Sequence, residues 1–412
     1  MYTGLFFVII AILVLDFALE TILDYLNGKN ASDTLPDEVK DLYDAEKYKK
    51  QQEYFVANER FGLVTGVFGF VVMMLMFFLF GFAFVDNLAR SCVEGTILVA
   101  LVFFAILYYA NEIISMPFSL YKTFVIEEKF GFNKMTKGLF VMDTLKSWLL
   151  TAVLGGGLIS LLVLIYERYG DYFWILGWNL VAFISIFMMM FYSNLIVPLF
   201  NKQELLEEGE LRTAIEVFCQ KVGYKLDNLY VIDGSKRTTK ANAYFTGLGA
   251  KKRIVLYDTL MSTLTTEEIV AVLAHEIGHY KKKHTKKMLV ISLLNSAVIF
   301  YLLSLVLGAY SKPFAEALGS DISSFHLSLI VFGILYTPIS TLLGIGVNVF
   351  SRKNEYEADN FAKEQGLAEP LISALRKLSE STLSNLTPHP AYVFFHYSHP
   401  TLLQRIRNLK RS

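Results

Sequence analysis

Residues 265–310, TTEEIVAVLAHEIGHYKKKHTKKMLVISLLNSAVIFYLLSLVLGAY, join a polar helix to a membrane-length apolar run. Thr265 and Glu268 form a capping box, and an apolar run starts at Ile269, so a helix is predicted to begin here. Residues 288–310 carry no charge and exceed the roughly 20 helical residues that cross a bilayer. The stretch therefore predicts a helical protein that lies partly inside and partly outside a membrane.

The composition of the whole chain also indicates a membrane protein. Of 412 residues, 54% are hydrophobic, with a mean hydropathy of +0.43, whereas soluble domains contain about 45–50% apolar residues. Its 38 basic residues balance 38 acidic ones, which suggests no nucleic-acid partner. The only cysteines, Cys92 and Cys219, exclude a disulfide framework and a thiolate zinc site, so a metal would need imidazole and carboxylate ligands.

Seven apolar stretches are long enough to be membrane-spanning helices. The predicted spans are residues 2–22, 61–85, 96–115, 145–166, 172–199, 288–310 and 325–350. The first lacks the basic start and the small-residue cleavage site of a signal peptide, so we expect it to be an uncleaved helix.

Basic residues in the connections predict the orientation of these spans. Lysines are abundant between spans one and two, three and four, and five and six, and in the C-terminal tail. In contrast, residues 86–94, 167–171 and 311–323 each contain a single Lys or Arg. We therefore expect a multi-pass protein of the bacterial inner membrane or the endoplasmic reticulum, with its N-terminus outside or lumenal and its C-terminus cytoplasmic.

Two polar regions follow the membrane segments, and the topology places both in the cytoplasm, where they can form one domain. Strands are predicted at residues 228–233, 241–246 and 253–258, before the capped helix. The domain organisation expected from this pattern is an N-terminal membrane region (1–200), the first part of a cytoplasmic domain (201–287), spans six and seven (288–350) and the second part of that domain (351–412).

The sequence His-Glu-Ile-Gly-His at residues 275–279 matches the H-E-x-x-H pattern of zinc metalloproteases. Residues four apart share a helix face, so His275 and His279 can bind one Zn²⁺ while Glu276 activates a bound water. The alternative is an accidental match on a surface helix. The chain has only seven histidines, and two of them occur at this spacing around a glutamate, which favours the metal site.

A catalytic zinc site also needs a third protein ligand. His284 lies out of phase with the ligand face of the helix, and its lysine neighbours suggest that it is solvated. Glu355 is the better candidate, because Asp359 shares its helix face and can orient a ligand imidazole. Glu357 is expected to point elsewhere. A solvated, charged start of a helix is the alternative for this segment.

Two histidines near the C-terminus, His396 and His399, could donate a hydrogen bond to a developing oxyanion. Their spacing does not choose between them, and a structural role is the alternative for each.

Beyond the zinc helix, blocks of sequence along nearly the whole chain resemble one family, the M48 integral membrane zinc metalloproteases of the Ste24 type, known as CAAX prenyl proteases. These blocks are FVIEEKFGFNK (124–134), PLFNK (198–202), SKR (235–237), NAYF (242–245), RIVLYDTL (253–260), SRKNEYEAD (351–359) and SHP (398–400).

The resemblance implies a mainly α-helical membrane protein. Its seven transmembrane helices would form a hollow barrel around a water-filled intramembrane chamber, capped by a cytoplasmic α+β zincin-type metalloprotease domain. It also implies one Zn²⁺ per chain on His275, His279 and Glu355, with Glu276 as the general base. His399 is the family match for the histidine beside the oxyanion.

The resemblance implies further site residues. Asp359 would be either a proton donor or, as we favour, a hydrogen-bond partner of His275, and Arg405 matches an arginine near the site that we assign to substrate binding. An edge strand containing Asn242, Ala243 and Tyr244 would pair with an extended substrate peptide, the alternative being an ordinary strand. Lys240 departs from the small polar residues usual at its position, so substrate preference could differ locally.

Four polar residues lie within the predicted spans, where they would face the chamber or form hydrogen bonds between helices. They are Asn111, Glu112, Asn194 and Asn295.

The function predicted from these features is zinc-dependent cleavage of peptide bonds near the C-terminus of prenylated substrates. Its partners would be a peptide or protein, prenylated or not, and membrane lipid. One alternative is a quality-control endopeptidase of the same family. A second, from another class, is a non-catalytic membrane scaffold or transporter, which would have no need for Glu276.

Overall fold

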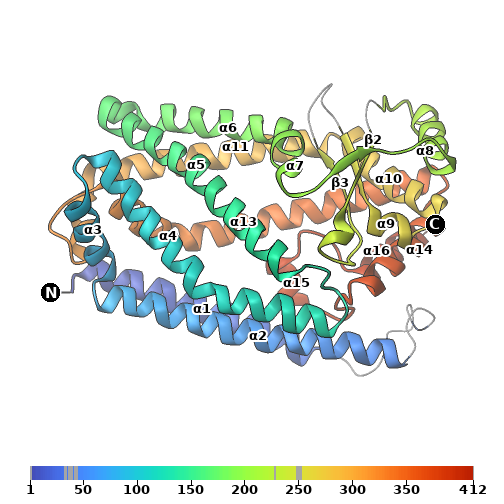
Figure 1. The fold of residues 1–412 in the computed structure, drawn as a ribbon, viewed down its shortest axis with the longest axis horizontal. Coiled ribbons are helices and arrows are strands. Elements are labelled where there is room, and N and C mark those ends of the chain that lie inside the picture. The colour runs from blue at the N-terminus through green and yellow to red at the C-terminus, as the bar shows by residue number, and fades with distance from the viewer. Residues whose placement is uncertain are drawn as a thin grey trace.

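The chain forms a long helical bundle with a mixed α/β domain at one end (Figure 1). The computed structural model describes residues 2–31, 35, 40, 45–226, 229–246 and 253–411. Chain ends lie apart in this arrangement, because the N-terminus is at the far end of the bundle and the C-terminus is in the mixed domain.

Six helical segments of the described chain are long and apolar enough to cross a membrane. Five are single: α1 (Gly4–Lys29), α2 (Ala45–Phe78), α4 (Thr96–Tyr121) with the π-helical turn that follows it (Lys122–Glu127), α11 (His284–Ala309) and α13 (Phe325–Glu364). The sixth, Lys137–Phe200, contains two long helices, α5 (Lys137–Tyr169) and α6 (Phe173–Leu195), and ends with the short helix α7 (Val197–Phe200). The chain turns back between α5 and α6 at Gly170. Five single helices and this pair give the seven predicted spans.

The predicted end of the second span was wrong. Helix α2 ends at Phe78, and the chain turns at Phe80, whose φ of 53° is left-handed, into the separate helix α3 (Gly81–Cys92). Gly81 allows this turn, because a Cβ there would lie 2.6 Å from the sulfur of Met76. The apolar pattern continues through the turn, so hydropathy alone could not locate the break.

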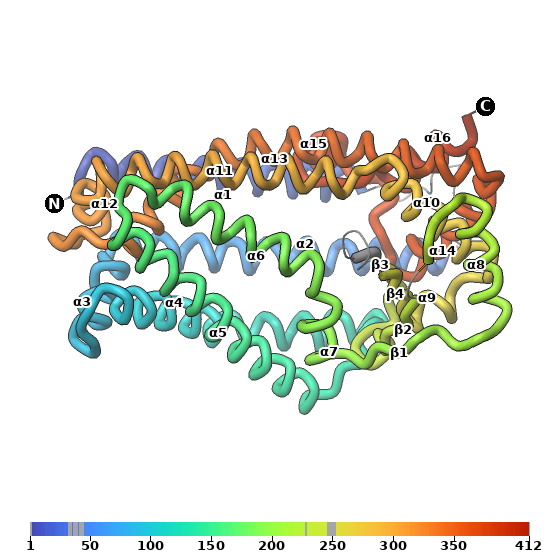
Figure 2. The backbone as a smooth tube through the Cα atoms, turned by 90° about the horizontal axis from the view of Figure 1, so that it is seen from above, coloured from blue at the N-terminus to red at the C-terminus, as the bar shows by residue number. Residues whose placement is uncertain are grey.

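The membrane helices bury little of their own surface against each other. In the most apolar window of each spanning segment, the buried share ranges from 6% in α2 to 22% in α13. One face of α2 exposes Leu63, Val67 and Val71, while a different face lines a cavity of about 690 Å³ shared with α4 and α13. Figure 2 shows α11 and α13 along one side of the bundle and α4 and α5 along the other. The bundle is therefore hollow, as predicted.

Polar residues of the spans use both of the options predicted for them. Trp148 Nε1 of α5 donates to Glu112 Oε2 of α4 at 3.0 Å, and the hydroxyl of Tyr336 in α13 donates to Asn295 Oδ1 of α11 at 3.3 Å. Asn111 instead lines the cavity between α2, α4 and α13.

The mixed domain contains a four-stranded sheet in the order β1-β2-β4-β3. Its strands are β1 (Gln203–Leu205), β2 (Leu229–Ile232), β3 (Ala243–Thr246) and β4 (Arg253–Tyr257). The pair β2–β4 is parallel, and the other two pairs are antiparallel. Strand β1 was not predicted, because three residues with two polar side chains carry no strand pattern. Among the described strands, β3 forms one edge of the sheet.

Short helices lie beside this sheet and at its junction with the bundle. They are α7 (Val197–Phe200), α8 (Glu210–Lys221), α9 (Asp258–Thr263), α10 (Thr266–Lys281), α14 (Ala368–Ser381), α15 (Pro390–His396) and α16 (Leu402–Lys410). At the junction, α15 contacts α13 and α1. A further helix, α12 (Ser311–Ala317), lies at the far end of the bundle (Figure 2). One hydrophobic core joins Leu256 of β4, Leu273 of α10, Leu371 of α14 and Ile406 of α16. The two polar regions of the sequence therefore share a core.

The capping box predicted at the start of α10 is confirmed. Thr265 Oγ1 accepts from the Glu268 amide, and Glu268 Oε2 accepts from the Thr265 amide at 2.8 Å. Glu268, which is buried, also accepts from Ser373 and Lys377 of α14. The same carboxylate thus caps the start of the helix and anchors it to the second part of the domain.

Candidate metal centre

The candidate centre lies where α10 crosses α13, and a glycine permits the close approach of the two helices. A Cβ added to Gly278 would lie 3.1 Å from both the Cα and the carbonyl oxygen of Ala358. The distance between packed helices depends on the side chains at the contact, so a glycine here lets the two backbones approach closely. This contact brings the side chains of Glu355 and the two motif histidines together.

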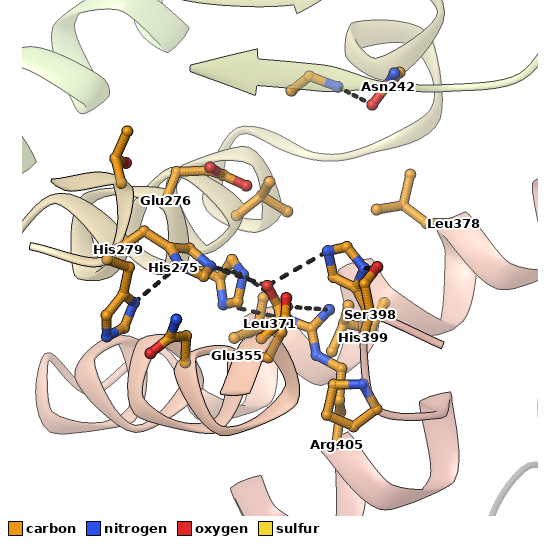
Figure 3. A pocket seen from close by; sticks show the side chains of 18 of the residues that line it. Asn242, His275, Glu276, His279, Glu355, Leu371, Leu378, Ser398, His399 and Arg405 are labelled. Atoms are coloured by element: carbon orange, nitrogen blue, oxygen red, sulfur yellow. Dashed lines mark hydrogen bonds and ion pairs between the residues drawn. The ribbon is translucent and has the colours of Figure 1, made fainter. Parts of the chain in front are cut away.

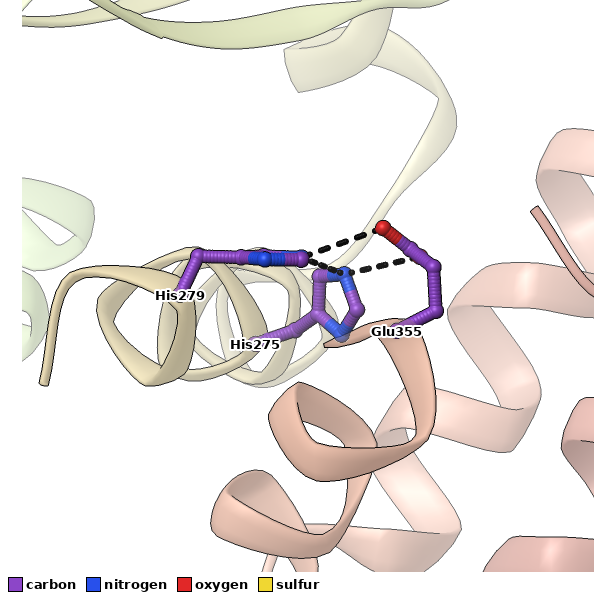
Figure 4. Close-up of side chains that lie close together, drawn as sticks. All are labelled: His275, His279 and Glu355. Atoms are coloured by element: carbon purple, nitrogen blue, oxygen red, sulfur yellow. Dashed lines mark hydrogen bonds and ion pairs between the residues drawn. The ribbon is translucent and has the colours of Figure 1, made fainter. Parts of the chain in front are cut away.

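Three potential ligand atoms converge at this crossing (Figure 4). His275 Nε2 and His279 Nε2 are 3.2 Å apart, and Glu355 places Oε1 3.2 Å from His279 Nε2 and Oε2 3.4 Å from His275 Nε2. Zinc bonds of about 2.0–2.1 Å in a tetrahedron put ligand atoms about 3.3 Å apart. The buried Oε2 of Glu355 has no hydrogen-bond partner among the described residues. The donors and their spacing therefore suit a zinc ion.

Asp359 lies behind His275 and orients its ring. His275 Nδ1 is 2.8 Å from Asp359 Oδ1, so Nδ1 can donate to the carboxylate while Nε2 faces the other two ligand atoms. Asp359 is fully buried, and Arg405 donates to both of its oxygens, at 2.6 and 2.9 Å. This buried carboxylate reaches the imidazole rather than the cavity, which supports a hydrogen-bond role over proton donation.

Arg405 was assigned to substrate binding, and its contacts favour a different role. Its side chain is only 12% exposed, and its Nε and Nη2 atoms are committed to Asp359. The remaining nitrogen lies 3.7 Å from Glu355 Oε2. Arg405 therefore stabilises the carboxylates on one side of the candidate site.

The surroundings of His275 also change its proton affinity. Burial and the nearby Arg405 lower the pKa of His275, but the carboxylates of Asp359 and Glu355 beside the ring raise it more, to about 9. Without a metal, His275 would therefore be protonated at neutral pH. Because only the neutral ring ligates, zinc binding must release that proton.

Of the two C-terminal histidines, His399 is the one near the ligands. Its Nε2 lies 3.4 Å from Glu355 Oε1, and its side chain is 64% exposed towards the cavity (Figure 3). His396 instead contacts α1, with Nε2 at 3.3 Å from Glu20 Oε2. The geometry thus distinguishes two residues that spacing could not.

A cavity of about 1520 Å³ connects these residues to the sheet edge and the membrane helices. Glu276 and Asn242 both line it, and Figure 3 shows the Glu276 carboxylate between the ligand group and the strand that follows Asn242. Ala243 also lines the cavity. Tyr244 does not, because its hydroxyl accepts from Gln203 at 3.2 Å and its side chain packs against a separate hydrophobic cluster that contains Val255.

Lys240, the departure from the family pattern, has its ammonium group engaged by neighbouring side chains. Its ammonium donates to Glu127 at 2.7 Å and to the Tyr54 hydroxyl at 2.9 Å, and it lies 4.4 Å from the centre of the Phe132 ring. Lys240 therefore links the segment before β3 to α2 and the π-helical turn, and its charge is largely compensated before any substrate arrives.

The prediction that His284 is solvated was wrong. The residue is 2% exposed, and its Nδ1 lies 3.0 Å from His279 Nδ1. The prediction assumes that α10 continues to residue 284. The helix instead ends at Lys281, and the chain turns at Lys283, whose φ of 60° is left-handed. Glu357 faces away from the ligand atoms, as predicted, and contacts His284. In the sequence, the only feature that could have indicated a buried role for His284 is a histidine within a run of lysines.

Two family models together match most of the chain. The model described as CAAX prenyl protease N-terminal, five membrane helices, matches residues 24–202, and the model for peptidase family M48 matches residues 205–412.

Similar proteins and a similar solved structure cover the chain nearly end to end. CAAX prenyl protease 1 of Saccharomyces cerevisiae is 34% identical, over 96% of this chain and 93% of that protein. The human homolog of CAAX prenyl protease 1 is 33% identical, over 91% of this chain and 88% of the human protein. The crystal structure of Ste24p from S. mikatae superposes with a TM-score of 0.92 at 33% identity, covering 99% of both chains.

M48 enzymes are metalloproteases that act on peptide or protein substrates. The hollow helical bundle, the attached α/β domain and the full-length similarity lead to one assignment. This chain belongs to peptidase family M48, as an integral membrane metalloprotease of the Ste24, or CAAX prenyl protease 1, type.

Proposed function

We propose that this chain is a zinc-dependent endopeptidase that cleaves prenylated proteins close to their C-termini. The observation that carries the proposal is the set of three ligand atoms 3.2–3.4 Å apart, contributed by His275, His279 and Glu355. They line a cavity that also reaches Glu276 and the edge strand β3.

The residues around the cavity would divide the hydrolytic reaction among them. Bound zinc would supply Lewis acidity towards the attacking water and the scissile carbonyl. Glu276 would take the proton of the attacking water and pass it to the leaving amine. His399 would donate a hydrogen bond to the oxyanion as it develops. Asn242 and Ala243 would hold the substrate backbone in an extended conformation beside Glu276.

An apolar modification on the substrate suits the membrane side of the cavity. Met188 and Met189 of α6 and Met288 of α11 line the same space as the ligand residues. A peptide that carries a prenyl group near its cleaved bond could therefore place the group among apolar side chains while its backbone meets the sheet edge. The similarity to CAAX prenyl protease 1 supports this class of substrate.

The orientation proposed for the chain follows from its lysines. The Lys-rich connection between α10 and α11 lies beside the candidate metal centre, which favours a cytoplasmic face for the α/β domain. The N-terminus would then be outside or lumenal, in a bacterial inner membrane or in the endoplasmic reticulum.

Cleavage assays on the purified full-length protein test this function. A farnesylated CAAX peptide should be cleaved at least about tenfold faster than the same peptide without the farnesyl group, since burial of two methylene groups supplies that difference. A zinc chelator should abolish the cleavage, and added zinc should restore it. The Glu276→Gln variant, purified identically, controls for contaminating proteases.

The outcomes separate the alternatives. Equal cleavage of both peptides would contradict prenyl selectivity and favour a quality-control endopeptidase. A zinc-loaded protein that cleaves neither peptide would contradict the proposed substrate class altogether.

A further inference from the structure

One pair of contacting side chains beside the candidate metal centre, His284 and Glu357, has no role in the chemistry described so far. His284, the first residue of α11, is 2% exposed, although five of the six other residues in positions 281–287 are lysines. The left-handed turn at Lys283 folds its ring back onto α10. Glu357 of α13 meets the ring from the other side.

The distances define a continuous chain of hydrogen bonds. His279 Nδ1 is 3.0 Å from His284 Nδ1, and His284 Nε2 is 3.0 Å from Glu357 Oε2. The other ring nitrogen of His279, Nε2, is the atom that faces His275 and Glu355.

Only one assignment of protons satisfies this arrangement when His279 ligates a metal. Because Nε2 of His279 must then present a lone pair, its proton resides on Nδ1, which donates to Nδ1 of His284. His284 consequently carries its own proton on Nε2, which donates to the carboxylate of Glu357. Each ring nitrogen of His284 and Nδ1 of His279 then has a hydrogen-bond partner of the required kind.

The other ligand imidazole, that of His275, contacts its supporting carboxylate directly. His275 Nδ1 meets the carboxylate of Asp359 at 2.8 Å, whereas His279 reaches a carboxylate only through the ring of His284. Helix α13 therefore supplies both supporting carboxylates, at positions 357 and 359, as well as the carboxylate of the candidate ligand Glu355.

We propose that His284 and Glu357 are positioning residues that set the tautomer and orientation of His279 for metal binding. The proposal rests on the metal site proposed above. Outer hydrogen-bond partners of ligand histidines typically change metal affinity by about 10–100-fold when they are removed. The pair should act on zinc affinity without contact with substrate.

The zinc affinity of the full-length protein tests this hydrogen-bond relay, which runs from His279 through His284 to Glu357. Apoprotein competes with a chromophoric chelator for zinc, and the dissociation constant is measured for wild type, His284→Ala, His284→Asn and Glu357→Ala. Both alanine variants should bind zinc about 10–100-fold more weakly. In His284→Asn the side-chain oxygen can still accept from Nδ1 of His279, so affinity should recover at least partly. Glu364→Ala, which removes an exposed carboxylate from the same helix, should match wild type.

Two results would overturn the proposal. One is a zinc dissociation constant in both alanine variants that equals the wild-type value. The other is an asparagine variant as weak as the alanine variant, which would mean that the ring only fills space. If His284→Ala does not fold, Glu357→Ala carries the test, because the Glu357 side chain is 35% exposed. Failure of the wild-type protein itself to bind zinc would instead refute the metal site on which the relay depends.

Discussion

The Glu276→Gln variant should lose peptide hydrolysis by a factor of about 10²–10⁴ while it keeps its zinc. Glutamine preserves the size and polarity of the side chain but cannot take a proton from water. Glu276 is not among the three residues whose ligand atoms converge, so metal binding should not depend on it. Measurement of kcat/KM for a cleaved peptide, together with the zinc content of the same preparation, checks both expectations.

A matched control lies on the same helix. Glu267 is exposed in the first turn of α10, so Glu267→Gln makes the same chemical change away from the cavity and should keep wild-type activity. If Glu276→Gln retains activity close to wild type, the general base must be another group. The non-catalytic scaffold or transporter would gain support if cells expressing Glu276→Gln showed no loss of function.

The Gly278→Val variant should lose both zinc binding and hydrolysis. The valine Cβ would meet backbone atoms of Ala358 at 3.1 Å, and its two methyl groups need further room, so α10 must move away from α13. Because the ligand atoms from the two helices lie only 3.2–3.4 Å apart, that movement separates Glu355 from the histidines. A displacement of about 1 Å costs about 100-fold in activity. Zinc content and kcat/KM are the measurements.

Gly346→Val is the matched control for this substitution. Gly346 lies within α13, and nothing is within 4 Å of a Cβ placed there, so the same change should leave the zinc content at the wild-type value. Wild-type zinc affinity in Gly278→Val would contradict the view that close helix packing builds the site.

The sequence was sufficient to predict those features that a local pattern determines. Long uncharged runs predict membrane helices because the bilayer demands internal backbone hydrogen bonds over about 20 residues. The start of α10 was equally readable, since Thr265 and Glu268 complete their capping box within one turn. Glu355 and Asp359 could be paired from their spacing alone, because both lie on one helix and four residues apart share a face.

Other features depend on contacts that no local pattern contains. His284 is buried because the turn at Lys283 directs it towards Glu357, more than 70 residues away in the chain. Arg405 reaches Asp359 from α16, so its position in the sequence did not reveal that its guanidinium donates to that carboxylate. The break at Phe80 leaves the apolar pattern intact, and β1 forms only because β2 lies beside it. Tertiary packing decides each of these.

The central claim is that one metal site is assembled from α10 and α13, two helices separated in sequence by the membrane span α11. The zinc content of wild type and Glu355→Ala, each dialysed against the same weak chelator, tests it most directly. We expect one zinc per chain in wild type and almost none in Glu355→Ala, with Glu364→Ala unchanged. A Glu355→Ala protein that retains one zinc as tightly as wild type would contradict the claim.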